Sequence, residues 1–191
     1  GFLNKSRGRF APIIGQDLND APLGSLSVEN SVWPENPFDL GPDEATRIGE
    51  EFEDNGNIWL GYYFEPRLIY PEPAFRNGPW LASDRRTVHL AVDVFGAAQT
   101  PVCAPLDATV YAVKNYARHL DYGGLIILAH KTPAGDEFYT LYGHLNPEVC
   151  DRLFVGDTLS KGTPFSALGD VTQNGGWSPH LHFQMALTLE G

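Results

Sequence analysis

Short stretches in which hydrophobic and polar residues alternate fill the second half of the chain, from residue 88 onward. Alternation of this kind is typical of β-strands that bury one face. It predicts strands at 88–95, 101–103, 108–114, 124–130, 137–143 and 180–187, and another short strand pair bracketed by Gly156-Asp157 and Lys161-Gly162. Polar turn residues at 132–136 join the fourth and fifth strands as a hairpin. We therefore expect a mainly β fold, an antiparallel sheet or barrel-sandwich, with no helix in this half.

The first 80 residues follow a different pattern. They hold nine of the 15 prolines and carry 13 acidic and 6 basic residues, a net charge of −7 against −4 for residues 81–191. Closely spaced prolines exclude long elements. The pattern predicts one short helix, from Pro42 to about Glu53, and strands at 57–64 and 67–70. We interpret residues 1–80 as an irregular N-terminal extension that packs, through its aromatic side chains, on a domain formed by residues 81–191.

Charge and cysteine content narrow the expected partners. The formal net charge of −11 opposes attraction to nucleic acid or to an anionic membrane, and no apolar run is long enough to span a bilayer. Cys103 and Cys150 are too few for a disulfide framework, so we interpret them as thiols of a cytosolic protein. A start without Met is typical of a piece of a longer protein. We therefore favour a cytoplasmic location, with neighbouring domains as further partners.

Histidine and aspartate side chains recur on the predicted strands at spacings that suit a shared ligand. His180 and His182 lie two residues apart in one strand, so they share a face, about 6.6 Å apart at roughly 3.3 Å per residue. His89 and Asp93 also share a face but would lie about 13 Å apart on a straight strand. Because ligand bonds to zinc are only about 2.0–2.2 Å long, the chain must bend between His89 and Asp93 if both bind one ion.

A further histidine, His144, ends an alternating run in which it shares a face with Tyr142, so both side chains could face one cleft. Two histidines and one aspartate with open coordination positions fit catalytic zinc, and equally the facial triad of non-haem iron oxygenases. Zinc hydrolysis is favoured because two more histidines remain as acid, base or oxyanion partners. No arginine follows His182 to hold an oxoglutarate co-substrate, and no downstream histidine completes a cupin motif.

Three short motifs carry a family resemblance in this order: His89-x-x-x-Asp93, Tyr142-Gly143-His144-Leu145 and Pro179-His180-Leu181-His182-Phe183. Over roughly residues 85–187 the chain resembles the lysostaphin-type (LytM-like) zinc metallopeptidases, which cut peptide cross-links of bacterial cell walls. It is also similar to a version of this domain that is embedded between a kinase-like and a PLP-dependent aminotransferase-like domain in large fusion proteins. The resemblance implies the barrel-sandwich called the duplicated hybrid motif.

By position, the resemblance implies that His89, Asp93 and His182 ligate Zn²⁺. It implies that His144 and His180 flank a metal-activated water as the catalytic groups. The expected activity is that of an endopeptidase that hydrolyses peptidoglycan-type, glycyl or D-amino-acid peptides, including muropeptides. The alternative is a catalytically silent module that binds a peptide or docks neighbouring domains of a larger protein.

Two side chains are candidate substrate contacts: Tyr142 as a hydrogen-bond donor to the reacting peptide, and Trp177 as a wall of the substrate groove. One departure from the family concerns Ala91, which stands where glycine is usual, inside the bend between the ligands His89 and Asp93. Alanine adopts fewer backbone conformations than glycine, so the ligand geometry depends on this position. The aromatic extension is expected to pack across the groove and to limit access to the metal.

Overall fold

The computed structural model describes residues 8–15, 18–27, 58–67 and 88–189. The expected mainly β fold is confirmed. In chain order the strands are β1 Leu23–Gly24, β2 Trp59–Gly61, β3 Glu65–Pro66, β4 Val88–His89, β5 Val92–Phe95, β6 Pro101–Cys103, β7 Ala108–Tyr116, β8 Gly123–Lys131, β9 Glu137–Leu145, β10 Thr158–Leu159, β11 Pro164–Ala167 and β12 His180–Ala186. Within these ranges the only helix is a short 3-10 helix, η4, Pro147–Asp151. The helix predicted over 42–53 lies outside the described residues.

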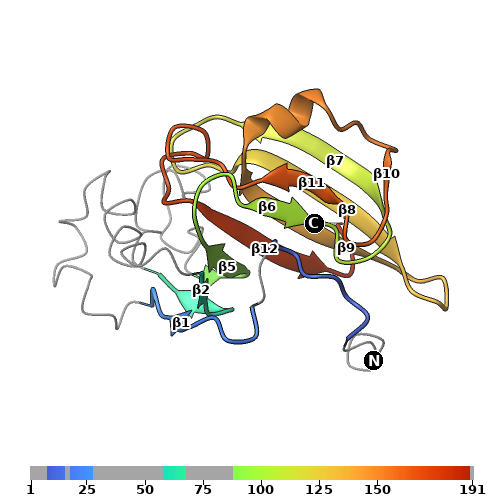
Figure 1. The fold of residues 1–191 in the computed structure, drawn as a ribbon, viewed down its shortest axis with the longest axis horizontal. Coiled ribbons are helices and arrows are strands. Elements are labelled where there is room, and N and C mark those ends of the chain that lie inside the picture. The colour runs from blue at the N-terminus through green and yellow to red at the C-terminus, as the bar shows by residue number, and fades with distance from the viewer. Residues whose placement is uncertain (1–7, 16–17, 28–57, 68–87, 190–191) are drawn as a thin grey trace, which may run out of the picture.

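Eight strands form one curved sheet in the order β1-β2-β5-β12-β9-β8-β7-β10 (Figure 1). All neighbours in it are antiparallel except β1 and β2, which are parallel. β6 and β11 form a small antiparallel sheet that lies across one face of the large one, and β3 pairs with β4 in a third sheet. No helix among the described residues is long and apolar enough to cross a membrane.

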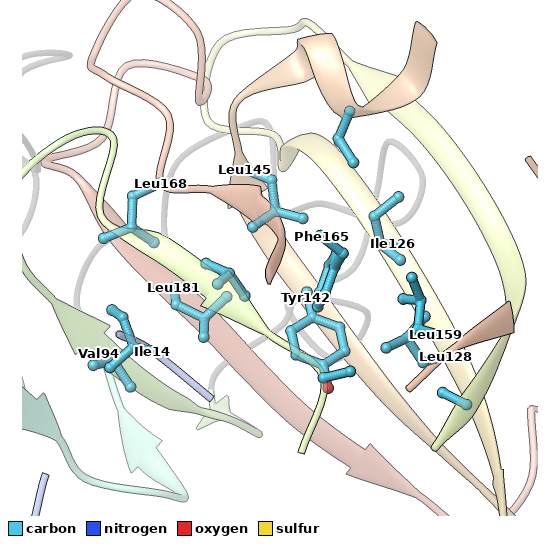
Figure 2. Packing of buried hydrophobic residues seen from close by; sticks show 14 of the residues in the cluster. Ile14, Val94, Ile126, Leu128, Tyr142, Leu145, Leu159, Phe165, Leu168 and Leu181 are labelled. Carbon is cyan, nitrogen blue, oxygen red and sulfur yellow. The ribbon is translucent and has the colours of Figure 1, made fainter. Parts of the chain in front are cut away.

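The hydrophobic core lies between the large sheet and the β6–β11 sheet (Figure 2). Leu181 of β12 is paired with Val94 of β5, and both side chains are fully buried. Burial of such a side chain contributes about 1.5–3 kcal/mol, which holds β12 and β5 against the core. Because side chains alternate along a strand, His180 and His182 point to the opposite face, where Asp93 is the partner of His182.

The strand predicted over 88–95 is two strands, because the backbone leaves sheet pairing at Leu90 and Ala91. β4 pairs with β3 and β5 joins the large sheet, so the chain has the bend that a metal site shared by His89 and Asp93 would require. Ala91 is fully buried, and it is not among the described residues with a positive φ angle. The bend therefore does not need glycine at this position.

The structure differs from the prediction in three places. η4 was not expected, although Asn146 caps it by accepting a hydrogen bond from the backbone N–H of Glu148 and Pro147 stands in its first turn. β10 and β11 do not pair with each other, because β10 pairs with β7 and β11 with β6. The strand predicted over 57–64 ends at Gly61, and Phe64 has a φ of 65° in the turn that leads to β3. Residues 68–70 lie outside the described ranges.

Candidate metal centre

Three side chains from three strands converge on one point. His89 comes from β4, Asp93 from β5 and His182 from β12, and all three are buried. His89 Nε2 lies 3.0 Å from His182 Nδ1 and 3.3 Å from Asp93 Oδ1. The third distance, from His182 Nδ1 to Asp93 Oδ1, is 3.5 Å. The structure thus brings together the three residues that the sequence predicts as ligands.

The two separations to Asp93 Oδ1 fit a metal site, and the 3.0 Å between the two imidazole nitrogens is somewhat shorter. In a tetrahedral zinc site with bonds of about 2.0–2.2 Å, the ligand atoms lie about 3.3–3.6 Å apart. Asp93 Oδ1 is buried and has no hydrogen-bond partner among the described residues. A buried carboxylate oxygen without a hydrogen bond is costly unless a cation or a donor meets it. Two imidazole nitrogens and one unpartnered carboxylate oxygen therefore form a donor set suited to a divalent ion.

The electrostatics favour the metal-binding forms of Asp93 and His89. Burial is the largest single effect and raises the pKa of Asp93, but the Arg67 guanidinium and the neighbouring histidines together outweigh it, so the pKa lies well below its usual range. Burial lowers the pKa of His89, and it outweighs the raising effect of Asp93. Asp93 is thus ionised and His89 neutral near pH 7. Metal binding requires both of these states.

His144 and His180 lie beside this cluster, with ring centroids 4.3 Å apart. His144 Nδ1 lies 3.0 Å from the backbone oxygen of Asn174, and His180 Nδ1 lies 2.6 Å from that of Ser178. A carbonyl oxygen only accepts, so each Nδ1 must carry the hydrogen. In a neutral imidazole this leaves Nε2 as an acceptor. His180 Nε2 is 3.9 Å from Asp93 Oδ1, which places it at the edge of the candidate metal site.

Both of these histidines are neutral near pH 7. Burial is the main cause: it lowers the pKa of His180 to about 4 and that of His144 well below its usual value. The Phe95 ring stacks on His180 with centroids 4.7 Å apart, and Trp59 stacks on the other side of Phe95 at 3.9 Å. This stack fixes the plane of the His180 ring. Each imidazole is therefore held in one tautomer and one orientation.

Tyr142 and Trp177, the predicted substrate contacts, lie in different places. The Tyr142 side chain is fully buried in the core, against Phe165 and Phe183. It does not accompany His144, because His144 has a φ of 63° and the alternation of β9 breaks there. Trp177, half-buried, has its ring centroid 5.8 Å from that of His144. The structure therefore places Trp177 beside His144 and gives Tyr142 a packing role.

Two further residues at the site were not predicted from the sequence. Arg67 donates a hydrogen bond from Nη1 to Asp93 Oδ2 over 2.6 Å. The half-buried Tyr122 ring lies 5.2 Å from the His182 ring and 5.6 Å from the His144 ring, centroid to centroid. Gly143 makes room for it, because a Cβ there would come within 2.4 Å of Tyr122 Cδ1. Neither residue belongs to a recognisable motif, so only the tertiary structure finds them.

The profile of peptidase family M23 matches residues 87–189, more than half of the chain, and the chain therefore belongs to this family of metallopeptidases. The resemblance to the lysostaphin-type (LytM-like) peptidases is thus confirmed. The chain is 26% identical over 184 residues to an uncharacterized metalloprotease of Haemophilus influenzae. That match takes in 94% of this chain and 36% of the relative, so the chain spans about a third of the relative's length.

Two solved structures are similar to the chain. One is a zinc-containing peptidase from Vibrio cholerae, with 21% identity over 66% of this chain and 32% of that chain and a TM-score of 0.46. The other is the catalytic domain of lysostaphin from Staphylococcus simulans, with 24% identity over 69% of this chain and 82% of that chain and a TM-score of 0.46.

Proposed function

We propose that this chain is a zinc-dependent endopeptidase that hydrolyses peptide bonds in peptidoglycan-type, glycyl or D-amino-acid peptides. The observation that supports it most is the convergence of His89, Asp93 and His182 on one point, with two further imidazoles beside it. Three protein ligands leave a coordination position open, as hydrolytic zinc sites require. Family membership supports a peptide substrate, and the narrower substrate class rests on the lysostaphin-type resemblance.

His89 Nε2, Asp93 Oδ1 and His182 Nδ1 would hold the ion. Zinc bound there supplies a Lewis acid for the scissile carbonyl and a water of lowered pKa. His144 and His180 present Nε2 as an acceptor, because each Nδ1 donates to a backbone oxygen. Either nitrogen can take the proton of the attacking water and pass it to the leaving amine. While the histidine carries this proton, its imidazolium can donate a hydrogen bond to the oxyanion.

The test combines metal analysis with turnover on the intact 191-residue chain. We expect about one zinc per chain, and cleavage of a panel of glycyl and D-alanyl peptides and muropeptides that stops on chelation and returns with zinc. An L-amino-acid peptide panel serves as the matched control for the substrate class. Activity that survives complete metal removal would contradict the metallopeptidase function. A chain that binds zinc and peptide but cleaves nothing would be the silent binding module instead.

A further inference from the structure

A salt bridge joins the candidate metal site, formed by His89, Asp93 and His182, to a segment that precedes the region of family similarity. Arg67 lies 20 residues before the matched residues 87–189. Its Nη1 is 2.6 Å from Asp93 Oδ2, and the two side chains are only 8% and 1% exposed. Because Arg67 occupies Oδ2, the unpartnered oxygen that faces the two histidines is Oδ1. The guanidinium thus fixes which carboxylate oxygen is presented to a metal.

Glu65 holds Arg67 in this position from the other side. Its Oε2 accepts hydrogen bonds from Arg67 Nε at 3.2 Å and from Arg67 Nη2 at 3.0 Å, a forked contact that fixes the guanidinium plane. Its Oε1 accepts from Ser25 Oγ at 3.0 Å and from the Leu26 N–H at 3.1 Å. The buried Glu65 carboxylate also balances the charge of Arg67. An incoming cation therefore meets little net repulsion from the pair.

The backbone of residues 58–67 also contacts the candidate metal site. Glu65 of β3 is in register with His89 of β4, so the strand that carries Glu65 also pairs with a ligand residue. In β2, Gly61 leaves space for the guanidinium, because a Cβ there would lie 3.3 Å from Arg67 Nη2 and 3.5 Å from Asp93 Cβ. Residues 58–67 thus contact the cluster through a side chain, a strand pairing and a close backbone approach.

We propose that Arg67, oriented by Glu65, is a positioning residue of the metal centre, and that the segment 58–67 is a structural part of the site. This inference rests on the proposed zinc function. Residues that contact metal ligands orient them, and their removal typically changes metal affinity by about 10–100-fold. Arg67 has this role toward Asp93, since it sets the carboxylate orientation while Glu65 cancels its charge. The site is therefore incomplete without residues that lie outside the family domain.

The test measures zinc affinity and ligand geometry rather than turnover. In the full chain we expect Arg67→Ala to weaken the zinc Kd by about 10–100-fold in competition with a chromophoric chelator. The visible absorption bands of the cobalt-loaded protein should also shift, because Asp93 would no longer be held with one oxygen toward the ion. Arg67→Lys should recover only part of the affinity, since lysine cannot make the forked contact with Glu65.

Arg152→Ala is the matched control, because Arg152 is an exposed arginine that pairs with Glu148 at 4.0 Å, and it should leave both readouts unchanged. If Arg67→Ala fails to fold, as judged by circular dichroism, Gly61→Ala carries the test, with an expected several-fold weaker Kd and the same direction of band shift. Wild-type protein that binds no zinc would refute the proposed function itself. The role of Arg67 alone would be overturned by a different result: the wild-type protein binds zinc, and the folded variant has a Kd within twofold of the wild-type value and unchanged cobalt bands.

Discussion

The buried histidines of two regions differ in their hydrogen-bond partners: His130 lies on β8, and His89 and His182 lie in the candidate metal site. His130 is 1% exposed, and His89 and His182 are each 3% exposed. Both ring nitrogens of His130 have partners: Nδ1 lies 3.1 Å from the backbone oxygen of Asp107, and Nε2 lies 2.7 Å from Thr140 Oγ1. Its ring also stacks on Phe138. His130 is therefore fully satisfied by the protein.

His89 and His182 of the candidate metal site do not have all their ring nitrogens hydrogen-bonded in this way. His89 Nε2 and His182 Nδ1 face each other and an unpartnered Asp93 oxygen, and the outer nitrogens of both rings have no hydrogen-bond partner among the described residues. Burial alone thus does not distinguish a structural histidine from a ligand. The distinction lies in where the donor and acceptor atoms point, and variants of each kind should separate the two roles.

The largest effect is expected for His182→Ala. It removes one of three metal ligands, so the loss of zinc affinity should exceed the ~10–100-fold that is typical of surrounding residues. Titration against a chelator measures it, and hydrolysis should vanish with the metal. His130→Ala is the matched control, because it removes an equally buried imidazole and should leave the zinc Kd unchanged. Zinc retained at wild-type affinity by His182→Ala would refute the ligand assignment.

His144→Ala and His180→Ala should keep the metal and lose turnover. General acid–base groups contribute about 10²–10⁴-fold, so kcat should fall by this amount at full zinc occupancy. The measurement pairs elemental analysis with single-turnover kinetics on one peptide. Emptying of the site by His180→Ala would instead reverse the roles of His180 and His182.

The spacing of residues along the chain was sufficient to predict most of the strands and the grouping of the candidate ligands. The two-residue period of β12 places His180 and His182 on one face, and the short reach of metal bonds requires the bend between His89 and Asp93. Both features follow from spacing along the chain. The order of motifs then identified the family and, with it, three candidate ligands, which the structure brings together.

Contacts between distant segments could not be predicted in this way. Arg67 and Asp93 are 26 residues apart, and nothing in the sequence around Arg67 marks it as a partner of Asp93. Tyr142 was predicted beside His144 because a regular strand places both on one face. The φ of 63° at His144 breaks that rule, and a positive φ at a non-glycine residue leaves no clear trace in sequence. Tertiary packing decides such positions.

His130→Ala should act on stability alone. The change leaves the Asp107 carbonyl and the Thr140 hydroxyl without their imidazole partner in the interior, and an unsatisfied buried group costs about 1–3 kcal/mol. Denaturant unfolding of the metal-free protein measures this free energy, with His119→Ala as a control at an exposed histidine. A fall in zinc affinity without a loss of stability would remove the distinction between the two kinds of buried histidine.

The smallest effect is expected for Tyr142→Phe. The Tyr142 hydroxyl lies 3.0 Å from Thr140 Oγ1 in the core, and one such hydrogen bond contributes about 0.5–1.5 kcal/mol to the free energy of unfolding. Because the ring packs against Phe165 and Phe183, kcat/KM should not change. Trp177→Phe is the companion variant, and it should raise KM if the indole lines the groove. A tenfold fall in kcat/KM for Tyr142→Phe at unchanged stability would instead place its hydroxyl at the substrate, as the sequence predicts.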